Sequence, residues 1–234
     1  MAILENLLDF FYPRFCICCK TRIQQPIQGY LCDHCFNKIV FNHTVCCACC
    51  GRALGTYEGA VCQNCAELKP YFHDGISLFT FNDVGRHFIH TLKYHNGIFL
   101  KKDLLKILSH EQEKLSSLKN TCFVPVPLHF MRKWKRGYNQ SFIISQALQR
   151  ICGGEIISIL KRKINTPSQT SLTRQERKLN VKDAFTLNVK TFDRSKTYVL
   201  VDDVFTTGAT LNECAGVLYR SGVKDIRVFT LAHG

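Results

Sequence analysis

Residues 199–210 read VLVDDVFTTGAT, and this stretch decides the fold. Residues 198–201 form a short apolar run, which is typical of a buried parallel strand. Asp202 and Asp203 follow at its carboxyl end, the edge at which open α/β sheets bind their ligands. The stretch therefore predicts a strand that delivers two carboxylates to a binding site.

The remainder of the stretch leads into a helix. Helical spacing covers residues 211–220, Gly222 would cap that helix, and residues 226–231 supply another strand, which completes a βαβ unit. The other elements that we expect are strands at 75–81 and 122–126 and helices at 86–92, 100–118 and 140–150. This alternation predicts an α/β fold built on a parallel sheet.

The turn between the strand and the helix has the composition of a phosphate site. A glycine-containing turn at a helix start presents backbone N–H groups, and the helix dipole adds positive charge, so a monophosphate can bind without a lysine. The expected donors are Thr206, Thr207, Gly208, Ala209 and Thr210. Asp202 and Asp203 would accept hydrogen bonds from ribose hydroxyls or help to hold Mg²⁺. Together these parts predict a ribose-5-phosphate site, although each feature alone also occurs where a helix is merely capped.

Eleven of the fourteen cysteines lie within residues 16–65. They include four C-x-x-C pairs, separated by 12 residues in the first half and 11 in the second, as in an internal duplication. Two such pairs can surround one tetrahedral Zn²⁺ and close a structural site. The expected ligands are Cys16, Cys19, Cys32 and Cys35 for one ion and Cys47, Cys50, Cys62 and Cys65 for the other.

The alternatives for the cysteines are a shifted register and redox chemistry. Cys46 and Cys49 have the same spacing as Cys47 and Cys50, so the register of that pair is open, with Gly51 favouring the later pair. A redox dithiol needs one reactive pair after a strand rather than four pairs in a polar stretch.

The apolar start at 3–11 is interrupted by acidic residues, so we expect a short amphipathic helix in a cytoplasmic protein with no membrane span.

Composition divides the chain near Lys69 and Pro70, which predicts an N-terminal helix and double ribbon at 1–70 and an α/β domain at 71–234. The net charge of +13 is uneven, because residues 1–70 carry 6 Lys and Arg against 5 Asp and Glu, whereas residues 71–234 carry 25 against 13. Such an excess attracts phosphate-bearing partners, either a phosphorylated metabolite or nucleic acid.

The string VLVDDVFTTGAT resembles the phosphoribosyl diphosphate motif of type I phosphoribosyltransferases, and the whole chain resembles the ComF family. In that family a double zinc ribbon precedes a phosphoribosyltransferase domain. The further matching stretches are LKYHNG at 92–97, VPVPL at 124–128, RGYNQS at 136–141 and QTSLTRQERKLNVKDAF at 169–185. The resemblance implies binding of phosphoribosyl diphosphate or a nucleotide, and a role in natural competence, where single-stranded DNA is taken up.

The same resemblance makes the turn after Pro127 a pyrophosphate-side loop and residues 163–182 a mobile loop over the substrate. Stabilising a departing pyrophosphate requires cationic donors. Arg174 and Arg177 are the catalytic candidates beside the two aspartates, and the expected phosphate-binding residues are Arg132, Arg136 and Gln169. For each of these arginines, a solvated basic face is the competing interpretation.

Two functions remain open at this point, and the acceptor substrate is not indicated by any motif. One is an enzyme that uses Mg²⁺ and displaces pyrophosphate from phosphoribosyl diphosphate. The other is a non-catalytic competence adaptor that binds single-stranded DNA or partner proteins. Residues 129–138 interleave basic with aromatic residues, as single-strand binders do, although Trp134 would more often be packed.

Overall fold

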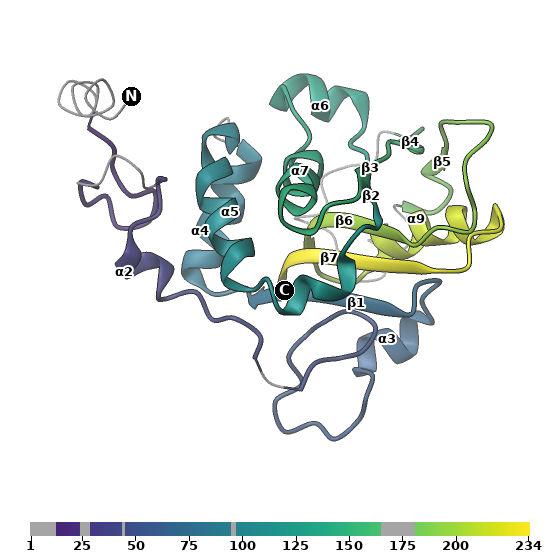
Figure 1. The fold of residues 1–234 in the computed structure, drawn as a ribbon, viewed down its shortest axis with the longest axis horizontal. Helices are drawn as coiled ribbons and strands as arrows, with labels where there is room; N and C mark the ends of the chain where they lie inside the picture. Colours follow the sequence, from purple (N-terminus) through teal and green to yellow (C-terminus); the bar gives the residue numbers. More distant parts are fainter. Residues whose placement is uncertain (1–12, 24–28, 44, 95–96, 165–180) are drawn as a thin grey trace.

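The structure is a computed structural model that describes residues 13–23, 29–43, 45–94, 97–164 and 181–234 (Figure 1). The helix expected at 3–11 and most of the loop expected at 163–182 lie outside the described residues. Among the described residues, no helix combines the length and the apolar character needed to span a bilayer.

A five-stranded sheet forms the centre of the molecule. Its strand order is β1-β7-β6-β2-β3, and every neighbouring pair is parallel. The strands are β1 (Asp74–Thr80), β2 (Cys122–Pro125), β3 (Glu155–Ile156), β6 (Tyr198–Phe205) and β7 (Ile226–His233). The run at 198–201 is fully buried, as expected for a parallel strand covered on both faces. The predicted parallel α/β sheet is therefore confirmed.

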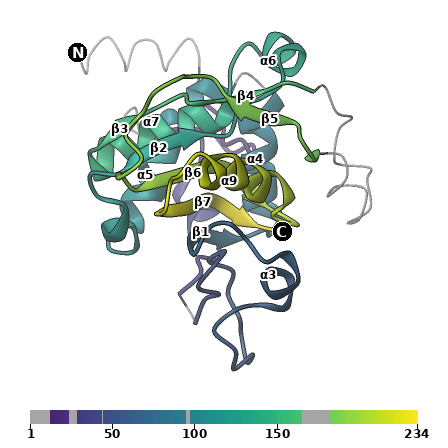
Figure 2. The same cartoon turned by 90° about the vertical axis from the view of Figure 1, so that its right-hand side faces the viewer.

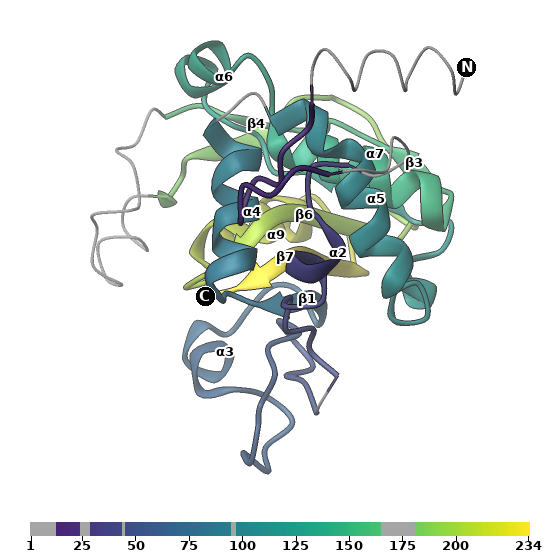
Figure 3. The same cartoon turned by 90° about the vertical axis from the view of Figure 1, so that its left-hand side faces the viewer.

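Two cores cover the two faces of this sheet. Helices α4 (Asp83–Tyr94), α5 (Lys101–His110) and α7 (Gln140–Cys152) pack in one core with Val199 and Val201 (Figure 3). Helix α9 (Ala209–Arg220) packs in the other with Tyr198 and Leu200 (Figure 2). Successive residues of β6 thus point to opposite cores, as the period of two in a strand requires.

The remaining elements are short. They are α2 (Asp33–Phe36), α3 (Gln63–Leu68), η1 (Gly97–Leu100), η2 (Lys114–Leu118), α6 (Phe130–Arg136), and the antiparallel pair β4 (Leu160–Arg162) and β5 (Phe185–Leu187). The helix expected at 100–118 is therefore divided into η1, α5 and η2. Glu111, which follows α5 directly, is buried beside His110 and interrupts the apolar spacing.

Strand β6 is longer than the apolar run that predicted it. It continues to Phe205 because β7 stays paired with it, with Asp202 opposite Thr230 and Phe205 opposite His233. On its other side, β2 ends at Pro125, opposite Val201. The expectation that Asp202 and Asp203 follow the strand is thus wrong in detail, since they lie within β6 but beyond the end of β2.

The cysteine-rich segment consists of a first ribbon (residues 13–43) and a second ribbon (residues 45–71). The antiparallel bridge between Phe15 and Arg22 recurs between Cys46 and Ala53, which confirms the duplication. Each ribbon also has one short helix that begins directly after a cysteine. The first ribbon joins the core of α4, α5 and α7, and the second joins the core of α9. The domain boundary near Lys69 and Pro70 stays a prediction.

Candidate functional site

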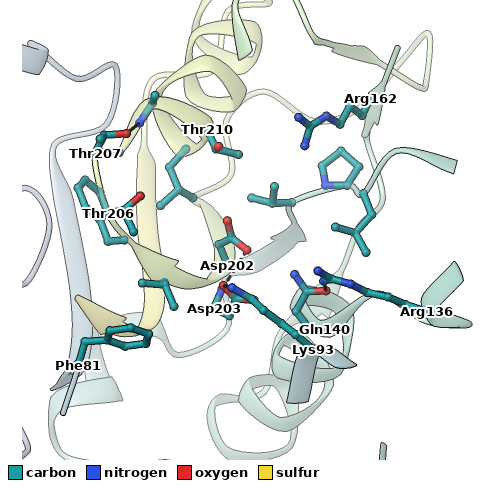
Figure 4. Close-up of a pocket in the computed structure, with 18 of the residues that line it drawn as sticks. Phe81, Lys93, Arg136, Gln140, Arg162, Asp202, Asp203, Thr206, Thr207 and Thr210 are labelled. Carbon is teal, nitrogen blue, oxygen red and sulfur yellow. Dashed lines mark hydrogen bonds and ion pairs between the residues drawn. The ribbon is translucent and has the colours of Figure 1, made fainter. Parts of the chain in front are cut away.

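A cavity of about 280 Å³ lies where β6 extends beyond β2. Its wall is formed by residues 202–211, and the rest of its lining comes from α4, α6, α7 and β4, from Phe81 and from residues 126–128 after β2 (Figure 4). The side chains of Asp202 and Thr210 point into the same space. The cavity therefore brings together the predicted carboxylate pair, Asp202 and Asp203, and the turn predicted to bind phosphate, which we call the phosphate turn (residues 206–210).

Both carboxylates are held by neighbouring groups. Asp202 accepts a hydrogen bond from the Ser141 hydroxyl at 3.0 Å and another from the Asp203 backbone N–H at 2.9 Å. The Asp203 side chain is only 5% exposed, and its Oδ1 lies 2.9 Å from the Lys93 ammonium. Its other oxygen, Oδ2, is buried without a hydrogen-bond partner among the described residues. A buried acceptor without a partner is costly, and a ligand hydroxyl or a cation bound beside Asp203 would remove that cost.

The pKa values of Asp202 and Lys93 are both raised, with different consequences for their charges. Burial raises the pKa of Asp202 to about 7, and the adjacent Asp203 adds to the rise, against the opposing effect of Lys93. Burial alone would lower the pKa of Lys93, but its contact with Asp203 outweighs that effect and the pKa is raised. Lys93 is thus held as a cation, while Asp202 takes up a proton more readily than an ordinary carboxylate.

The turn before α9 has the backbone that a phosphate site needs. Gly208 has a φ of +74°, and a Cβ there would lie 2.4 Å from the Phe205 ring, so both conformation and space require glycine. Gly208 supplies no capping side chain, and the first turn of α9 lines the cavity. A helix N-terminus of this kind attracts anions through its N–H groups and its dipole.

Cations line the side of the cavity opposite Thr206 and Thr207 (Figure 4). Arg136 donates to Gln140 Oε1 at 2.9 Å and lies over the Tyr94 ring at 4.8 Å. Arg162 enters from β4 and lies over the Phe185 ring at 5.2 Å. The cavity thus has hydroxyl and amide donors at one end and fixed positive charge at the other.

The structure brings together most of the predicted site. Asp202, Asp203, Arg136 and residues 206–210 all line the cavity. The side chain of Arg132, and all of Gln169, Arg174 and Arg177, lie outside the described residues, so their roles stay predictions. Four further residues at or beside the cavity were not predicted from the sequence: Lys93, Gln140, Ser141 and Arg162. The first three lie in LKYHNG and RGYNQS, so these stretches held the signal that would have found them.

The cysteines form two four-sulfur groups. Cys16, Cys19, Cys32 and Cys35 have all their sulfurs within 4.8 Å of one another, and so have Cys47, Cys50, Cys62 and Cys65. The Sγ atoms of Cys19 and Cys32 are 3.6 Å apart, and those of Cys50 and Cys62 are 3.8 Å apart. Tetrahedral Zn²⁺ with Zn–S bonds of about 2.3 Å requires sulfurs about 3.8 Å apart, so both groups fit the metal. The register is that of Cys47 and Cys50.

Similar backbone contacts support both sulfur groups. The Cys32 N–H points to Cys16 Sγ at 3.5 Å, and the Cys62 N–H points to Cys47 Sγ at 3.3 Å. A backbone N–H directed at a cysteine sulfur helps to fix the position of that sulfur within its group. The two sites are therefore closed structural sites with the same local design.

Comparisons with known proteins agree with this arrangement. The family model of the double zinc ribbon domain matches residues 7–66. Competence protein F of Haemophilus influenzae is 33% identical over 233 residues, covering 97% of this chain and 99% of that protein. Competence protein ComFC of Streptococcus pneumoniae is 30% identical, covering 86% of this chain and 84% of that protein. DNA utilization protein YhgH of Escherichia coli K12 is 28% identical, covering 94% and 96%.

A solved structure, the purine phosphoribosyltransferase from Pyrococcus horikoshii, aligns with 54% of this chain and 79% of its own. The identity is 15% and the TM-score is 0.34, a value too low to bear on the fold. The assignment of the architecture depends instead on the parallel sheet and the double ribbon described above.

The sulfur geometry predicts two equivalents of zinc in the purified protein, each held independently. Cys32→Ser should release about one equivalent and leave the second, and Cys62→Ser should release the other one, because each variant removes one ligand of one closed site. Elemental analysis of reduced, untagged protein measures both values. Loss of both ions from Cys32→Ser would contradict separate sites.

The raised pKa of Asp202 predicts a stability that falls with pH. Between about pH 4 and 7 the native state binds more protons at this group than the unfolded chain does, so the free energy of unfolding decreases as pH rises. The free energy of unfolding of Asp202→Asn, relative to that of the parent, should therefore increase by about 1–2 kcal/mol as the pH rises from 5.5 to 7. Urea denaturation at the two pH values measures this change.

Asp225→Asn is the matched control. Burial opposes ionisation of Asp225, but hydrogen bonds from Thr197 and Arg227 prevail and lower its pKa. That variant should show no gain with rising pH. If the stability difference between Asp202→Asn and the parent does not change with pH, the pKa of Asp202 is not raised as described.

Proposed function

Because the chain belongs to the ComF family, we propose that its cavity binds phosphoribosyl diphosphate or a nucleoside 5′-phosphate and that it transfers the phosphoribosyl group in a Mg²⁺-dependent reaction linked to natural competence. One observation carries the proposal. The two aspartates and the first turn of α9 line a single cavity of about 280 Å³. This combination suits a sugar that bears a terminal phosphate.

The chemistry of the walls orients the ligand. The 5′-phosphate would bind the N–H groups and hydroxyls of residues 206–210, and ribose hydroxyls would donate to Asp202 and to the orphaned Oδ2 of Asp203. The diphosphate would then extend toward the cations at the other end, including Arg136 and Arg162. Mg²⁺, when bound with the diphosphate, supplies further positive charge to the leaving group.

In the transfer, the bond from ribose C1 to the pyrophosphate oxygen breaks and a bond from C1 to the acceptor forms, with loss of a proton from the acceptor. Positive charge develops on the ribose, and negative charge develops on the leaving group. The nearby carboxylates would stabilise the positive charge on the ribose, and the arginines would stabilise the negative charge on the pyrophosphate. Residues of this chain thus act by fixed electrostatics, with no covalent intermediate.

Ligand binding and transfer can be tested with one pair of substitutions. Phosphoribosyl diphosphate with Mg²⁺ at roughly 100 times its Kd should stabilise the parent by about 2.7 kcal/mol. Asp202→Asn with Asp203→Asn should lose this stabilisation and all turnover, because no carboxylate then accepts the ribose hydroxyls. Thermal shift measures binding, and consumption of phosphoribosyl diphosphate with a panel of acceptors measures turnover.

Zinc content, which should stay at two equivalents, shows that both ribbons of the double variant are folded. Asp193→Asn, at an exposed carboxylate outside the cavity, is the matched control and should behave as the parent. A parent protein that shows no shift with any phosphoribosyl compound would refute the proposed site.

A second candidate function is an adaptor for single-stranded DNA, and α6 favours it. Three apolar side chains of this helix are exposed: Phe130 at 71%, Met131 at 51% and Trp134 at 87%. The Trp134 side chain is thus exposed rather than packed, although a tryptophan in such a stretch is more often packed. Exposed aromatic rings beside basic residues such as Lys135 suit base stacking and backbone contacts. The name of the YhgH relative refers to DNA utilization.

Trp134 is the single tryptophan of the chain, so its fluorescence reports directly on this surface. Under the adaptor hypothesis, oligothymidylate should quench it, and Trp134→Ala should weaken binding by roughly tenfold, in line with about 1–3 kcal/mol per stacked base. Tyr57→Ala, at an exposed ring in the second ribbon, should bind as the parent does. Binding without quenching, measured alongside by anisotropy, would place the DNA elsewhere.

A further inference from the structure

The two ribbons have the same local design but different neighbours. The first ribbon docks on α5, where the Asp103 carboxylate accepts the N–H groups of Tyr30 and Leu31 at 2.8–3.0 Å. Lys106 of the same helix forms an ion pair with Asp33. Neither Asp103 nor Lys106 lines the cavity. The first zinc site is thus anchored to a helix rather than to the phosphate turn.

The second ribbon instead touches the phosphate turn through α3. A Cβ placed on Gly208 would lie 2.8 Å from Leu68 Cδ2, so the backbone of the turn lies directly against this side chain. The Asn64 amide donates to the Thr207 carbonyl at 3.5 Å. Just after α3, the Tyr71 N–H donates to the Asn212 side chain of α9 at 2.8 Å. Two contacts from α3 and one from Tyr71, which follows it, therefore join the second ribbon to the turn and to α9.

The body of the second ribbon is packed against β1, an edge strand of the sheet. Gly51 has a φ of +71°, and a Cβ there would lie 2.2 Å from the backbone N of Ser77 in β1. The Ser77 hydroxyl donates to the Cys50 carbonyl at 2.8 Å. The ribbon therefore has little freedom to move away from the turn while its fold is intact.

Zinc is what keeps α3 folded. The helix has six residues, begins directly after Cys62 and contains Cys65, both of which are in the second sulfur group. A helix this short does not persist in water without tertiary support, and in small ribbons metal binding supplies much of the folding free energy. Loss of the second zinc would therefore remove the surface on which residues 207 and 208 rest.

We propose that Leu68 and Asn64 are positioning residues for the phosphate turn, and that the second zinc, but not the first, maintains phosphate affinity by holding α3 in place. The ligand part of this inference rests on the proposed function, whereas the mechanical coupling does not. A turn that is already fixed loses less conformational entropy when the phosphate binds. The second ribbon is thus part of the binding site although its metal does not touch the ligand.

Amide hydrogen exchange of residues 207–212 tests the coupling without any ligand. Cys65→Ser, which empties the second site, should speed exchange in this segment roughly tenfold or more, and Cys35→Ser, its counterpart in the first site, should leave it unchanged. Leu68→Ala should also speed exchange while retaining two zinc ions, which keeps the test valid even if Cys65→Ser does not fold. Asp33→Ala, which removes the ion pair of the first ribbon, is the matched control for Leu68→Ala.

Binding of phosphoribosyl diphosphate then tests the consequence. Leu68→Ala should weaken it roughly tenfold in Kd, and Asp33→Ala should not. Equal exchange in Cys65→Ser and Cys35→Ser, or unchanged exchange and affinity in Leu68→Ala, would overturn the inference. A parent that binds no phosphoribosyl compound but shows the exchange difference would refute the proposed function and leave the coupling supported.

Discussion

Strand β6 continues past the end of β2, and the whole candidate site depends on this overhang. Because β7 stays paired with β6 while β2 stops at Pro125, Asp202 and Asp203 keep a strand conformation with one side open. The opening becomes the cavity, and the continued pairing makes its wall rigid. The arrangement also buries negative charge, which is costly unless it is paired. Lys93 from α4 offsets part of that cost at Asp203, and the pKa of Asp202 rises to about 7.

Features that depend on neighbouring residues in the chain could be predicted from the sequence. The strand, turn and helix at 198–220 are local, and so are the cysteine pairs, since two intervening residues alone direct both sulfurs to one metal. The length of β6 was underestimated because it depends on β7, which is distant in the sequence. The stretches LKYHNG and RGYNQS marked Lys93 and Ser141 but not what they contact, because Lys93 and Arg162 reach the cavity, and Ser141 reaches Asp202, only after the chain has packed. The antiparallel pair of β4 and β5 gives too short an apolar signal to be found.

The duplicated ribbons show how one local design acquires two roles. At equivalent positions after the first cysteine pair, the chain has a positive φ at Lys20 and at Gly51. Lys20 is exposed and donates to the Ile17 carbonyl, so a side chain is tolerated there at some conformational cost. Gly51 is packed against β1, where no side chain fits. The difference at this one position follows from docking, because Gly51 lies against the backbone of β1 whereas Lys20 is exposed.

The Lys93–Asp203 pair bears on how a metal would take part. With Lys93 paired to Asp203 and the pKa of Asp202 raised, part of the charge of the carboxylate pair is already balanced by the protein itself. Ribose hydroxyls can then donate to the carboxylates without a divalent cation between them. A diphosphate, by contrast, carries several negative charges of its own, and Mg²⁺ commonly binds proteins together with substrate phosphates. Any need for Mg²⁺ in this site would therefore come from the diphosphate group of the ligand and not from the aspartates. A nucleoside 5′-monophosphate would then bind without Mg²⁺, whereas phosphoribosyl diphosphate would need it.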